Sequence, residues 1–530
     1  MNFPSLLYPG SMPHSAAPEP GYFRDLNLDQ VVAAVTRGKR EYALEAYFNH
    51  IPRNADVVRF RQAVMRELED AALFEIIERF ANRMREMRVK LVQAERHYYL
   101  LQRQRALLDA MAQYCEAVLE LHRNLAARDT LNSDGLRGFS DGLTAYVNSD
   151  RFAELSEGVR RLLDALGEVR YCILLDGDRV SVRRSDGEPD YAPRIEKTFA
   201  RFRQGDAEEH GFSFTNLPQM NHVEAQILEG VAHLHGELFA DIETFCGRHA
   251  AAEPPPEAST DNGSALIFAR YPFIEDGVAR FDREVQFYLA WLGFIAPMRR
   301  VGLRFSYPDF AGAVRSIRAT QTFDIALADK LLADEHLPVL NGFRLDGAER
   351  VIVVTGPNQG GKTTFARTFG QLHHLAGLGC CVPGEDVRLI LCDAVYTHFE
   401  RQEQLATRRS KLEDDLVRLH ETLASASGDS ILIFNEIFDS TTYDDALYLS
   451  SQILTRLLEL NARCVWVTFL DELSHFGKEV VSMVSSTAPD DPTARTYKIE
   501  RRAADGLAYA LSLAEKHRLT RSALLQRLPS

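Results

Sequence analysis

The sequence lacks several features that would assign it to a membrane, secreted or zinc-binding class. No unbroken apolar run reaches the ~18 residues that a membrane-spanning helix requires. The seven cysteines are scattered, odd in number and without C-x-x-C spacing, which indicates reduced thiols. The first residues have neither the basic nor the apolar region of a secretory signal. We therefore expect a cytoplasmic protein that does not bind a membrane.

Glycine and proline are also missing over long stretches. Glycine is absent from Lys39 to Asp134, and proline is absent from Arg53 to Glu188, so nothing in their overlap breaks a helix. Apolar residues recur here at intervals of three and four: Ile77, Phe80, Met84, Met87, Leu91, Ala94, Tyr98, Leu101 and, after an interruption at Arg105, Leu108. This spacing predicts one long helix that packs lengthwise on partners, as in a coiled coil.

The overall charge argues against indiscriminate binding to nucleic acid. The net charge is −14, whereas such binding depends on Lys and Arg neutralising phosphates. A local exception lies between Arg79 and Arg105, where eight Lys/Arg face only Glu86 and Glu95, a net charge of +6. Two interpretations remain open: this is the solvated face of a helix, or it contacts a nucleic-acid backbone.

Composition divides the 530 residues into three parts. Residues 1–22 are rich in proline, and we expect a flexible tail. Residues 23–318 favour long helices, interrupted at about 168–264 by an insertion that carries a β-hairpin signal, two alternating runs around Asp176-Gly177. Residues 319–530 alternate short apolar strands with helices. The predicted fold is therefore an all-α region with a small β-containing excursion, followed by an α/β domain.

The strands predicted in the C-terminal part are apolar without alternation. This pattern is typical of strands buried on both faces, and so of a mainly parallel sheet with crossover helices. The candidate strands are Val351–Thr355, Leu389–Cys392, Ile431–Phe434, Cys464–Thr468 and Val480–Val484.

A glycine-rich stretch directly follows the first of these strands and fits the spacing G-x-x-x-x-G-K-[ST]. In such a phosphate loop, backbone N–H groups close around phosphate oxygens, Lys362 reaches the β- and γ-phosphates, and Thr363 offers a hydroxyl to Mg²⁺. The sequence therefore predicts a P-loop domain that binds ATP and Mg²⁺. The predicted nucleotide-binding residues are Gly356, Pro357, Asn358, Gln359, Gly360, Gly361, Lys362, Thr363 and Thr364.

A second polar pair, Asn435 and Glu436, ends the strand that begins at Ile431. Glu436 is the candidate to polarise an attacking water, and so a catalytic residue together with Lys362. Asn435 would support Mg²⁺ through a water, but an amide brings no charge where such ATPases usually have an aspartate, so we expect slow hydrolysis. The alternative for Glu436 is a helix-start carboxylate that only stabilises the helix dipole.

Two further segments are expected on the same side of the sheet. Ser410 and Glu413 have the spacing of a capping box, which alone explains both residues, although the helix N-terminus they create also suits a γ-phosphate. Phe469 ends the next strand, where a polar sensor is expected, and a phenyl ring cannot donate a hydrogen bond.

Five segments together resemble motifs of the MutS family of DNA mismatch-repair ATPases. The Pro357-Asn358 pair makes this match more specific than a generic phosphate loop. The similarity covers about residues 320–528. The segments are Thr355–Thr364, similar to T-G-P-N-M-G-G-K-S-T; Leu405–Ser410, similar to L-A-S-G-R-S; Asn435–Ile437, at the D-E-I; Ser440–Asp445, similar to G-T-S-T-Y-D-G with Asp444 or Asp445 as the counterpart; and Gly506–Ala514, similar to a C-terminal helical motif.

The resemblance implies an ABC-ATPase-like domain preceded by the family's helical core, lever and clamp. It also implies a homodimer formed through the C-terminal motif, in which Ser410 completes the partner's nucleotide site in trans. Asn435 replaces the family's aspartate, Phe469 its histidine, and Pro338 the aromatic residue that stacks on adenine. Val339 and Asn341 are then the candidates for contacts with the base.

From this resemblance we expect a MutS-like dimeric clamp that hydrolyses ATP on branched or structured DNA. The sequence begins at the lever region, so we expect no mismatch-reading domain of its own and allow for a separate recognition partner. The alternative is a nucleotide-gated scaffold, or a protein that binds structured RNA or the ribosome, with little hydrolysis.

Overall fold

The computed structural model divides the chain into two compact units that interleave in sequence. Unit 1 comprises Met1–Phe3, Ala72–Thr130 and Gly138–Asp282, and unit 2 comprises Pro4–Ala71, Leu131–Arg137 and Arg283–Ser530. No helix among the described residues combines the length and the hydrophobicity needed to cross a membrane. The residues described are 1, 3–10, 18–128, 130–177, 179–185, 187, 198, 220–250, 271–310, 316–400, 411–488, 491–504, 519–521 and 524.

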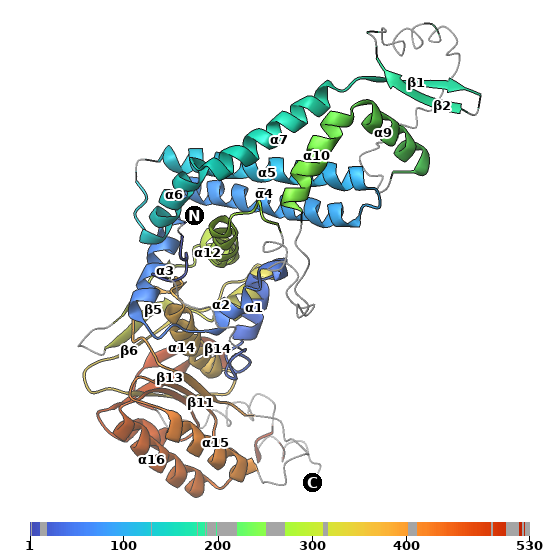
Figure 1. The fold of residues 1–530 in the computed structure, drawn as a ribbon. Helices are drawn as coiled ribbons and strands as arrows, with labels where there is room; N and C mark the ends of the chain where they lie inside the picture. The colour runs from blue at the N-terminus through green and yellow to red at the C-terminus, as the bar shows by residue number, and fades with distance from the viewer. Residues whose placement is uncertain are drawn as a thin grey trace. The chain divides into compact units, whose positions relative to one another are not determined.

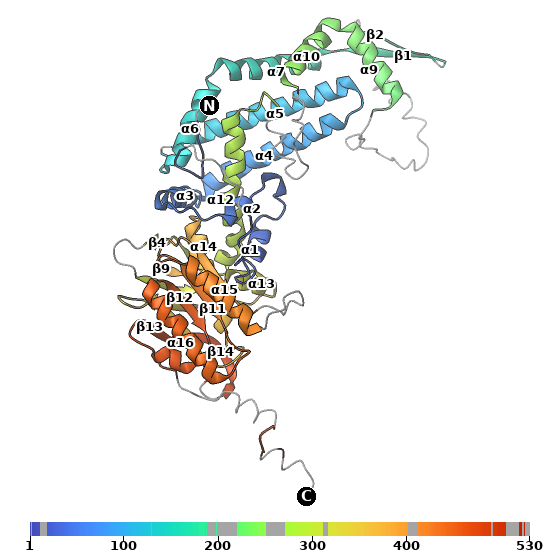
Figure 2. The same ribbon diagram turned by 60° about the horizontal axis from the view of Figure 1, so that its bottom comes forward.

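Unit 1 consists mainly of helices and carries one β-hairpin (Figure 1). Helices α4 and α5 run side by side and antiparallel (Figures 1 and 2). Strands β1 and β2 pair antiparallel, with Asp176 opposite Arg179, which confirms the predicted hairpin. The elements of unit 1 are α4 (Ala71–Arg96), α5 (Leu100–Ala126), most of α6 (Asp134–Val147), α7 (Asp150–Glu168), β1 (Tyr171–Asp176), β2 (Arg179–Arg184), α9 (His222–Leu234), α10 (Gly236–His249) and the first part of α12 (Asp276–Arg300).

The prediction of one continuous helix through Leu108 is wrong. The apolar series is buried as far as Ala94, but α4 ends at Arg96 and α5 begins at Leu100. Tyr98, a member of the series, lies in the turn and is 84% exposed. Because α5 folds back against α4, the apolar stripe is buried within the same chain instead of along a continuous seam.

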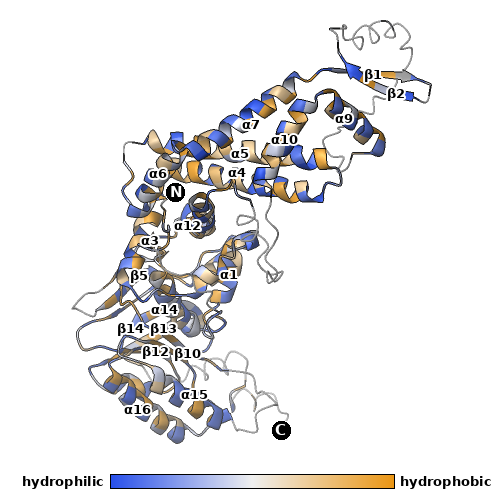
Figure 3. Ribbon diagram, viewed as in Figure 1, coloured by the Kyte–Doolittle hydropathy of each residue, from blue (hydrophilic) through white to orange (hydrophobic). Residues whose placement is uncertain are grey.

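The basic surface predicted on this helix is largely paired with carboxylates inside unit 1. Apolar and polar residues alternate along α4 and α7, as Figure 3 shows. Three of the predicted cations reach carboxylates of α4 or α5, and Arg88 is buried against Asp282 of α12. These contacts favour a solvated, ion-paired helix face over a nucleic-acid contact. The three pairings are Arg79 with Glu75 and Glu120, Arg83 with Glu116 and Glu120, and Arg105 with Asp109.

The N-terminal segment is packed, in contrast to the flexible tail expected for residues 1–22. Leu6 and Leu7 are fully buried in unit 2. The Glu284 carboxylate accepts a hydrogen bond from the Ser5 hydroxyl at 2.9 Å. The proline content predicts a flexible segment, but the burial of two adjacent leucines outweighs the entropy cost of ordering these few residues. Residues 11–17 lie outside the described part of the chain.

Within the described residues, unit 2 combines helices with three β-sheets. Its helices are α1 (Leu28–Val35), η1 (Arg40–Tyr42), α2 (Glu45–Asn49), α3 (Ala55–Glu67), the rest of α12, α13 (Ile325–Ala333), α14 (Lys362–Gly377), α15 (Lys411–Ser425), α16 (Tyr443–Leu460) and η4 (Asp471–His475), as resolved within the described ranges. Its strands are β3 (Phe305–Ser306), β4 (Asp309–Phe310), β5 (Ile317–Thr322), β6 (Asn341–Leu345), β7 (Val351–Thr355), β8 (Val382–Pro383), β9 (Glu385–Leu389), β10 (Val395–His398), β11 (Ile431–Asn435), β12 (Arg463–Val467), β13 (Val480–Ala488) and β14 (Asp491–Arg501).

The largest sheet of unit 2 has the order β10-β11-β12-β7-β13-β14. Its first five strands are parallel and β14 is antiparallel, so the predicted mainly parallel sheet is confirmed. Four of the five candidate strands match observed strands to within a few residues. The fifth, Leu389–Cys392, is wrong. The predicted range falls between β9, which ends at Leu389, and β10, which begins at Val395. β10 is an edge strand whose Tyr396 and Thr397 are only half-buried, so it lacks a continuous apolar run.

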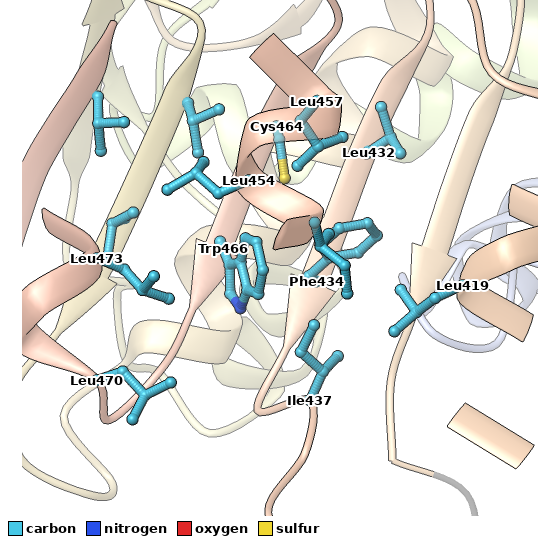
Figure 4. Close-up of a cluster of buried hydrophobic side chains, with 14 of the residues drawn as sticks. Leu419, Leu432, Phe434, Ile437, Leu454, Leu457, Cys464, Trp466, Leu470 and Leu473 are labelled. Atoms are coloured by element: carbon cyan, nitrogen blue, oxygen red, sulfur yellow. The ribbon is translucent and has the colours of Figure 1, made fainter. Parts of the chain in front are cut away.

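Alternate residues of β11 point to opposite faces of this sheet. Leu432 and Phe434 join Trp466 of β12 in a buried cluster completed by residues of α15 and α16 (Figure 4). Ile433 points the other way, toward α14, where a Cβ on Gly370 would lie 3.2 Å from its side chain. The sheet thus has α14 on one face and α15 and α16 on the other, and α14 begins at the carboxyl end of β7.

Two adjacent histidines, His373 and His374, are fully buried on α14. Burial lowers the pKa of each imidazole to about 4. The Phe48 carbonyl can only accept a hydrogen bond, so His374 Nε2 donates to it at 2.9 Å, and Nδ1 accepts from the Tyr22 hydroxyl at 3.0 Å. Both nitrogens of His374 are thus bonded inside the fold.

We expect unit 2 to lose stability as the pH falls from about 6.5 to about 4. A histidine in the unfolded chain has a pKa of about 6.5, so as the pH falls the unfolded chain binds protons before the folded protein does. Each buried histidine therefore lowers the free energy of unfolding by about 3 kcal/mol over this interval. Above about pH 6.5 the contribution is constant. Urea unfolding followed by the fluorescence of Trp291 and Trp466, both in unit 2, measures the effect. His374→Gln preserves both hydrogen bonds and should flatten the pH dependence; an unchanged slope would contradict the assignment.

Candidate nucleotide site

A tight loop joins β7 to α14 and holds its shape through two glycines. Gly356 has a φ of +114°, and a Cβ there would lie 3.0 Å from the Ser485 backbone nitrogen. Gly361 has a φ of +91° and precedes the first residue of α14. Residues other than glycine rarely adopt such φ angles, and at Gly356 there is also no room for a side chain. We refer to residues 356–361 as the glycine loop.

Lys362 lies at the start of α14, with its amine enclosed by the glycine loop. Its Nζ donates to the Gly356 carbonyl at 2.8 Å, to the Pro357 carbonyl at 3.2 Å and to the Asn358 amide oxygen at 3.3 Å. Burial lowers the pKa of Lys362, while the negative charge of Glu436 raises it. The fold thus holds a partly desolvated cation at the mouth of the loop, as an anion site requires.

The ends of two strands bring Thr363, Asn435 and Glu436 together, as the sequence predicts. The Thr363 hydroxyl donates to the Asn435 amide oxygen at 2.8 Å. Glu436 follows at a φ of +53°, and its backbone N–H donates to the Val467 carbonyl at 2.9 Å. A non-glycine residue held in this left-handed region is strained, and such strain is concentrated at functional sites.

A cavity of about 780 Å³ opens beside the glycine loop. One wall is formed by the loop, the start of α14 and Glu436. A second, largely apolar part of the lining comes from the segment between β5 and β6. It includes Phe323, Leu327, Leu331, Leu337, Pro338 and Val339. A lining that combines polar, cationic groups with apolar side chains is typical of a pocket that takes the phosphates and a flat ring of one ligand.

Tyr497 of β14 also lines this cavity, and the sequence gave no reason to select it. Its backbone has a φ of +58°, at an irregularity where Thr487 pairs with Arg495 and Ser485 with Ile499. Its side chain lies 3.7 Å from the position that a Cβ on Gly361 would take. Bulges of this kind redirect side chains next to binding sites. No residue pattern in β14 announces the irregularity.

Asn341, predicted to contact a base, lines the cavity with its amide already bonded. Its Nδ2 donates to the Tyr497 carbonyl at 3.0 Å, and its Oδ1 accepts from the Ile499 N–H at 2.9 Å. Both ends of the side chain therefore join β6 to β14. In this structure Asn341 supports the strand that carries Tyr497 and does not offer its amide to a base.

Other predicted residues lie outside the described part of the chain or away from the loop. Ser410, with the whole Leu405–Ser410 segment, and Gly506–Ala514 belong to the undescribed residues. Phe469 is half-exposed, with its ring 6.2 Å from that of Tyr443. Asp445 has a capping role, because its N–H and carboxylate both bond to the hydroxyl of Thr442 at the start of α16.

Three side chains near the glycine loop offer oxygen atoms as metal ligands. Thr363 supplies a hydroxyl, Asn435 an amide oxygen and Glu436 a carboxylate. Mg²⁺ prefers oxygen ligands and is held by one or two carboxylates together with substrate phosphates, so this set fits it. Within the described ranges, no group of three or more His, Cys, Asp or Glu is placed to hold a metal ion by itself.

Comparison with known proteins identifies the domain that contains this site. The family model for MutS domain V matches residues 352–525, which include most of the glycine loop's strand, the loop itself and Glu436. Over these residues the chain is similar to the MutS family. Its recognition from the five sequence motifs is thereby confirmed.

The MutS relatives share about a third of the chain. Endonuclease MutS2 of Thermus thermophilus is 31% identical over 180 residues, which are 34% of this chain and 24% of that protein. DNA mismatch repair protein MutS of Listeria welshimeri is 27% identical over 189 residues, 35% of this chain and 22% of the relative. DNA mismatch repair protein MutS of Zymomonas mobilis is 34% identical over 137 residues, which are 26% of this chain and 16% of that protein. The match therefore spans about a quarter or less of each relative.

Proposed function

We propose that the protein is a MutS-like ATPase that works as a dimeric clamp on branched or structured DNA. One observation carries the nucleotide-binding part: the amine of Lys362 is held within the glycine loop, beside a cavity of about 780 Å³. A buried cation next to backbone N–H groups at a helix start is suited to a polyphosphate. On this basis the domain is a P-loop domain with an ABC-ATPase-like sheet.

The cavity walls suggest how a nucleotide would lie. The phosphates belong with the glycine loop, Lys362, Thr363 and Thr364. The base belongs against the apolar wall, near Pro338 and Val339. Tyr497 lies beside Gly361 in the lining of the cavity and is an aromatic residue that would contact the nucleotide.

The same residues account for metal binding and hydrolysis. Thr363, Asn435 through a water, and Glu436 would hold Mg²⁺, which when bound neutralises charge on the β- and γ-phosphate oxygens. Glu436 is the carboxylate positioned to accept a proton from an attacking water. Asn435 orients Thr363 without adding a negative charge. Hydrolysis is therefore expected to be slow.

Replacing Asn435 with aspartate should raise ATP turnover about fivefold and leave ATP affinity unchanged. The carboxylate makes a charge-assisted bond to a metal-bound water, stronger than the amide bond by about 1 kcal/mol, which corresponds to that factor. Steady-state phosphate release and calorimetric titration separate turnover from affinity. Asn54→Asp is a matched control, because Asn54 caps α3 and aspartate caps equally well. Turnover that stays at the wild-type rate would show that Asn435 does not limit hydrolysis.

Binding to DNA is inferred from the family and not from a basic surface on α4. The relatives include proteins named DNA mismatch repair protein MutS and Endonuclease MutS2. Dimerisation through Gly506–Ala514, with Ser410 reaching the partner's nucleotide, is part of this proposal. The β1–β2 hairpin, which exposes Arg179, is then the element of unit 1 that would contact nucleic acid.

A second candidate is a nucleotide-gated scaffold with little hydrolysis. Phe469 favours it, because a half-exposed phenyl ring packed near Tyr443 cannot report on a γ-phosphate by hydrogen bonding. Asn435 favours it for the reason given above. In this function ATP would change the conformation of the dimer without being consumed at a useful rate.

A binding panel at one fixed salt concentration separates these functions. The panel compares four-way branched DNA, linear duplex DNA of the same length and a structured RNA, each with and without ATP. The clamp predicts preferential binding to branched DNA, an affinity that depends on ATP, and ATP turnover stimulated by that DNA. Preference for RNA would replace the substrate in the proposal. Binding to none of the three, with ATP still bound, would leave the scaffold.

A further inference from the structure

Arg495 of β14 lies beside the glycine loop and shares one of its residues with Lys362. Its Nε donates to the Asn358 backbone carbonyl at 3.1 Å. The side-chain amide oxygen of the same Asn358 lies 3.3 Å from the Lys362 Nζ. Asn358 therefore contacts two cationic side chains, one through its backbone and one through its side chain.

Two cations that contact the same residue repel each other. The pKa of Lys362 is lowered first by burial, and the charge of Arg495 lowers it further, while Glu436 and Asp471 act in the opposite direction. Such an arrangement costs free energy in the protein alone. It becomes favourable when a multiply charged anion binds, because both cations then interact with the opposite charge.

The place of Arg495 along the loop indicates which part of a polyphosphate it meets. In a loop of this spacing, the backbone N–H groups hold the α- and β-phosphates, and the lysine reaches the β- and γ-phosphates. Asn358 contacts this lysine directly. Arg495 is thus on the side of the loop where the lysine meets the outer phosphates.

We propose that Arg495 binds the terminal phosphate of a nucleoside triphosphate in its own subunit, so that the site distinguishes triphosphates from diphosphates. The proposal rests on the nucleotide-binding function proposed above. Arginine suits this task because its planar guanidinium carries five N–H donors, so it holds the Asn358 carbonyl and a phosphate oxygen at the same time. Arg495 lies two residues before Tyr497 on β14; of these two residues Tyr497 lines the cavity, and Arg495 contacts the glycine loop beside it.

The competing role for Arg495 is structural support of the loop. A guanidinium that only fixes the Asn358 carbonyl would help the loop to bind every nucleotide alike. A ligand of the terminal phosphate helps only the triphosphate. The ratio of ATP to ADP affinity therefore separates the two roles, whereas ATP affinity alone does not.

The test is calorimetric titration of ATP and ADP into the full chain as wild type, Arg495→Gln, Arg495→Lys and a control, Arg456→Gln. Arg456 is an exposed arginine on α16 that pairs with Glu459. For Arg495→Gln we expect ATP affinity to fall about tenfold to a hundredfold, the range for one hydrogen bond to a charged group, and ADP affinity to fall less than about threefold. Arg495→Lys, which keeps the charge, should recover part of the ATP affinity, and Arg456→Gln should change neither.

Equal losses of ATP and ADP affinity in Arg495→Gln would overturn the proposal in favour of a structural role. Unchanged affinities would overturn it as well, while leaving nucleotide binding intact. Wild-type protein that bound neither nucleotide would overturn the proposed function itself, and this inference with it. Thermal unfolding of each variant, followed by tryptophan fluorescence, verifies that unit 2 is folded at the temperature of the titration.

Discussion

Replacing Lys362 with alanine is expected to weaken ATP binding about 100-fold or more. The amine is the one cation enclosed by the described part of the glycine loop, where it already makes three hydrogen bonds. Hydrogen bonds to charged groups contribute roughly 1.5–3 kcal/mol each, and every 1.4 kcal/mol is a factor of ten in affinity. The measurement is a calorimetric titration of ATP in the presence of Mg²⁺.

Stability should not account for this loss. Burial lowers the pKa of Lys362, which means that the protein holds the charged amine at a cost in free energy. Its removal offsets the loss of the loop hydrogen bonds, and we expect the free energy of unfolding to stay within about 1 kcal/mol of wild type. Lys478→Ala, at an exposed lysine of the same unit, is the matched control and should bind ATP normally. If the Lys362→Ala protein bound ATP as tightly as wild type, the site would be misassigned.

The sequence predicts the phosphate side of the site because that side is local. The glycine loop, Lys362 and Thr363 follow one another in the chain, and Asn435 ends a strand whose apolar run is unmistakable. Parallel strands end at the same edge of a sheet, so their polar termini meet. The observed bond between the Thr363 hydroxyl and the Asn435 amide is the consequence.

The rest of the site depends on contacts between distant segments. Tyr497 and Arg495 lie at an irregularity in the pairing of β14 with β13. The polar sequence of β14 does not reveal where this pairing shifts. Asn341 shows the converse. The sequence predicts Asn341 near the base. In the fold, however, its side-chain amide makes hydrogen bonds to the backbone of β14, more than 150 residues away in the sequence. Such use of a side chain is visible only in three dimensions.

The helical region shows the same limit. The interval of three and four residues correctly predicts which residues of α4 are buried, because the pattern is a property of the helix itself. It does not reveal the turn after Arg96, since no glycine or proline marks it. Glu116 and Glu120 are far from Arg83 in the sequence, but the turn brings them next to it on α5. A basic stripe in sequence is thus an ion-paired surface in the fold.

Breaking the buried pair between Arg88 and Asp282 is expected to destabilise unit 1 strongly. Both side chains are almost completely inaccessible, at 2% and 0% exposure. Asp282 follows Phe281, whose ring is stacked on Phe139 with centroids 3.5 Å apart. The pair therefore lies in an aromatic, low-dielectric part of the core. Removing one partner leaves a buried charge without its counter-ion, which costs about 3–5 kcal/mol.

Single and double variants separate the contribution of the ion pair from the cost of burying each charge alone. Arg88→Met should lower the free energy of unfolding by about 3–5 kcal/mol, whereas the double variant Arg88→Met/Asp282→Leu should recover most of that loss, because well-packed apolar residues often replace a buried ion pair at no net cost. Arg105→Met is the control, since it breaks an exposed pair with Asp109 worth at most about 0.5 kcal/mol.

Urea unfolding followed by far-ultraviolet circular dichroism is the appropriate measurement, because both tryptophans belong to unit 2 and do not report directly on unit 1. Recovery in the double variant would show that Asp282 is costly only when its partner is missing. A double variant as unstable as Arg88→Met would mean that the two charges contribute through separate contacts and not as a pair. The ion pair would then be a consequence of their neighbouring positions on α4 and α12, and the stability of unit 1 would rest on the aromatic packing around Phe281.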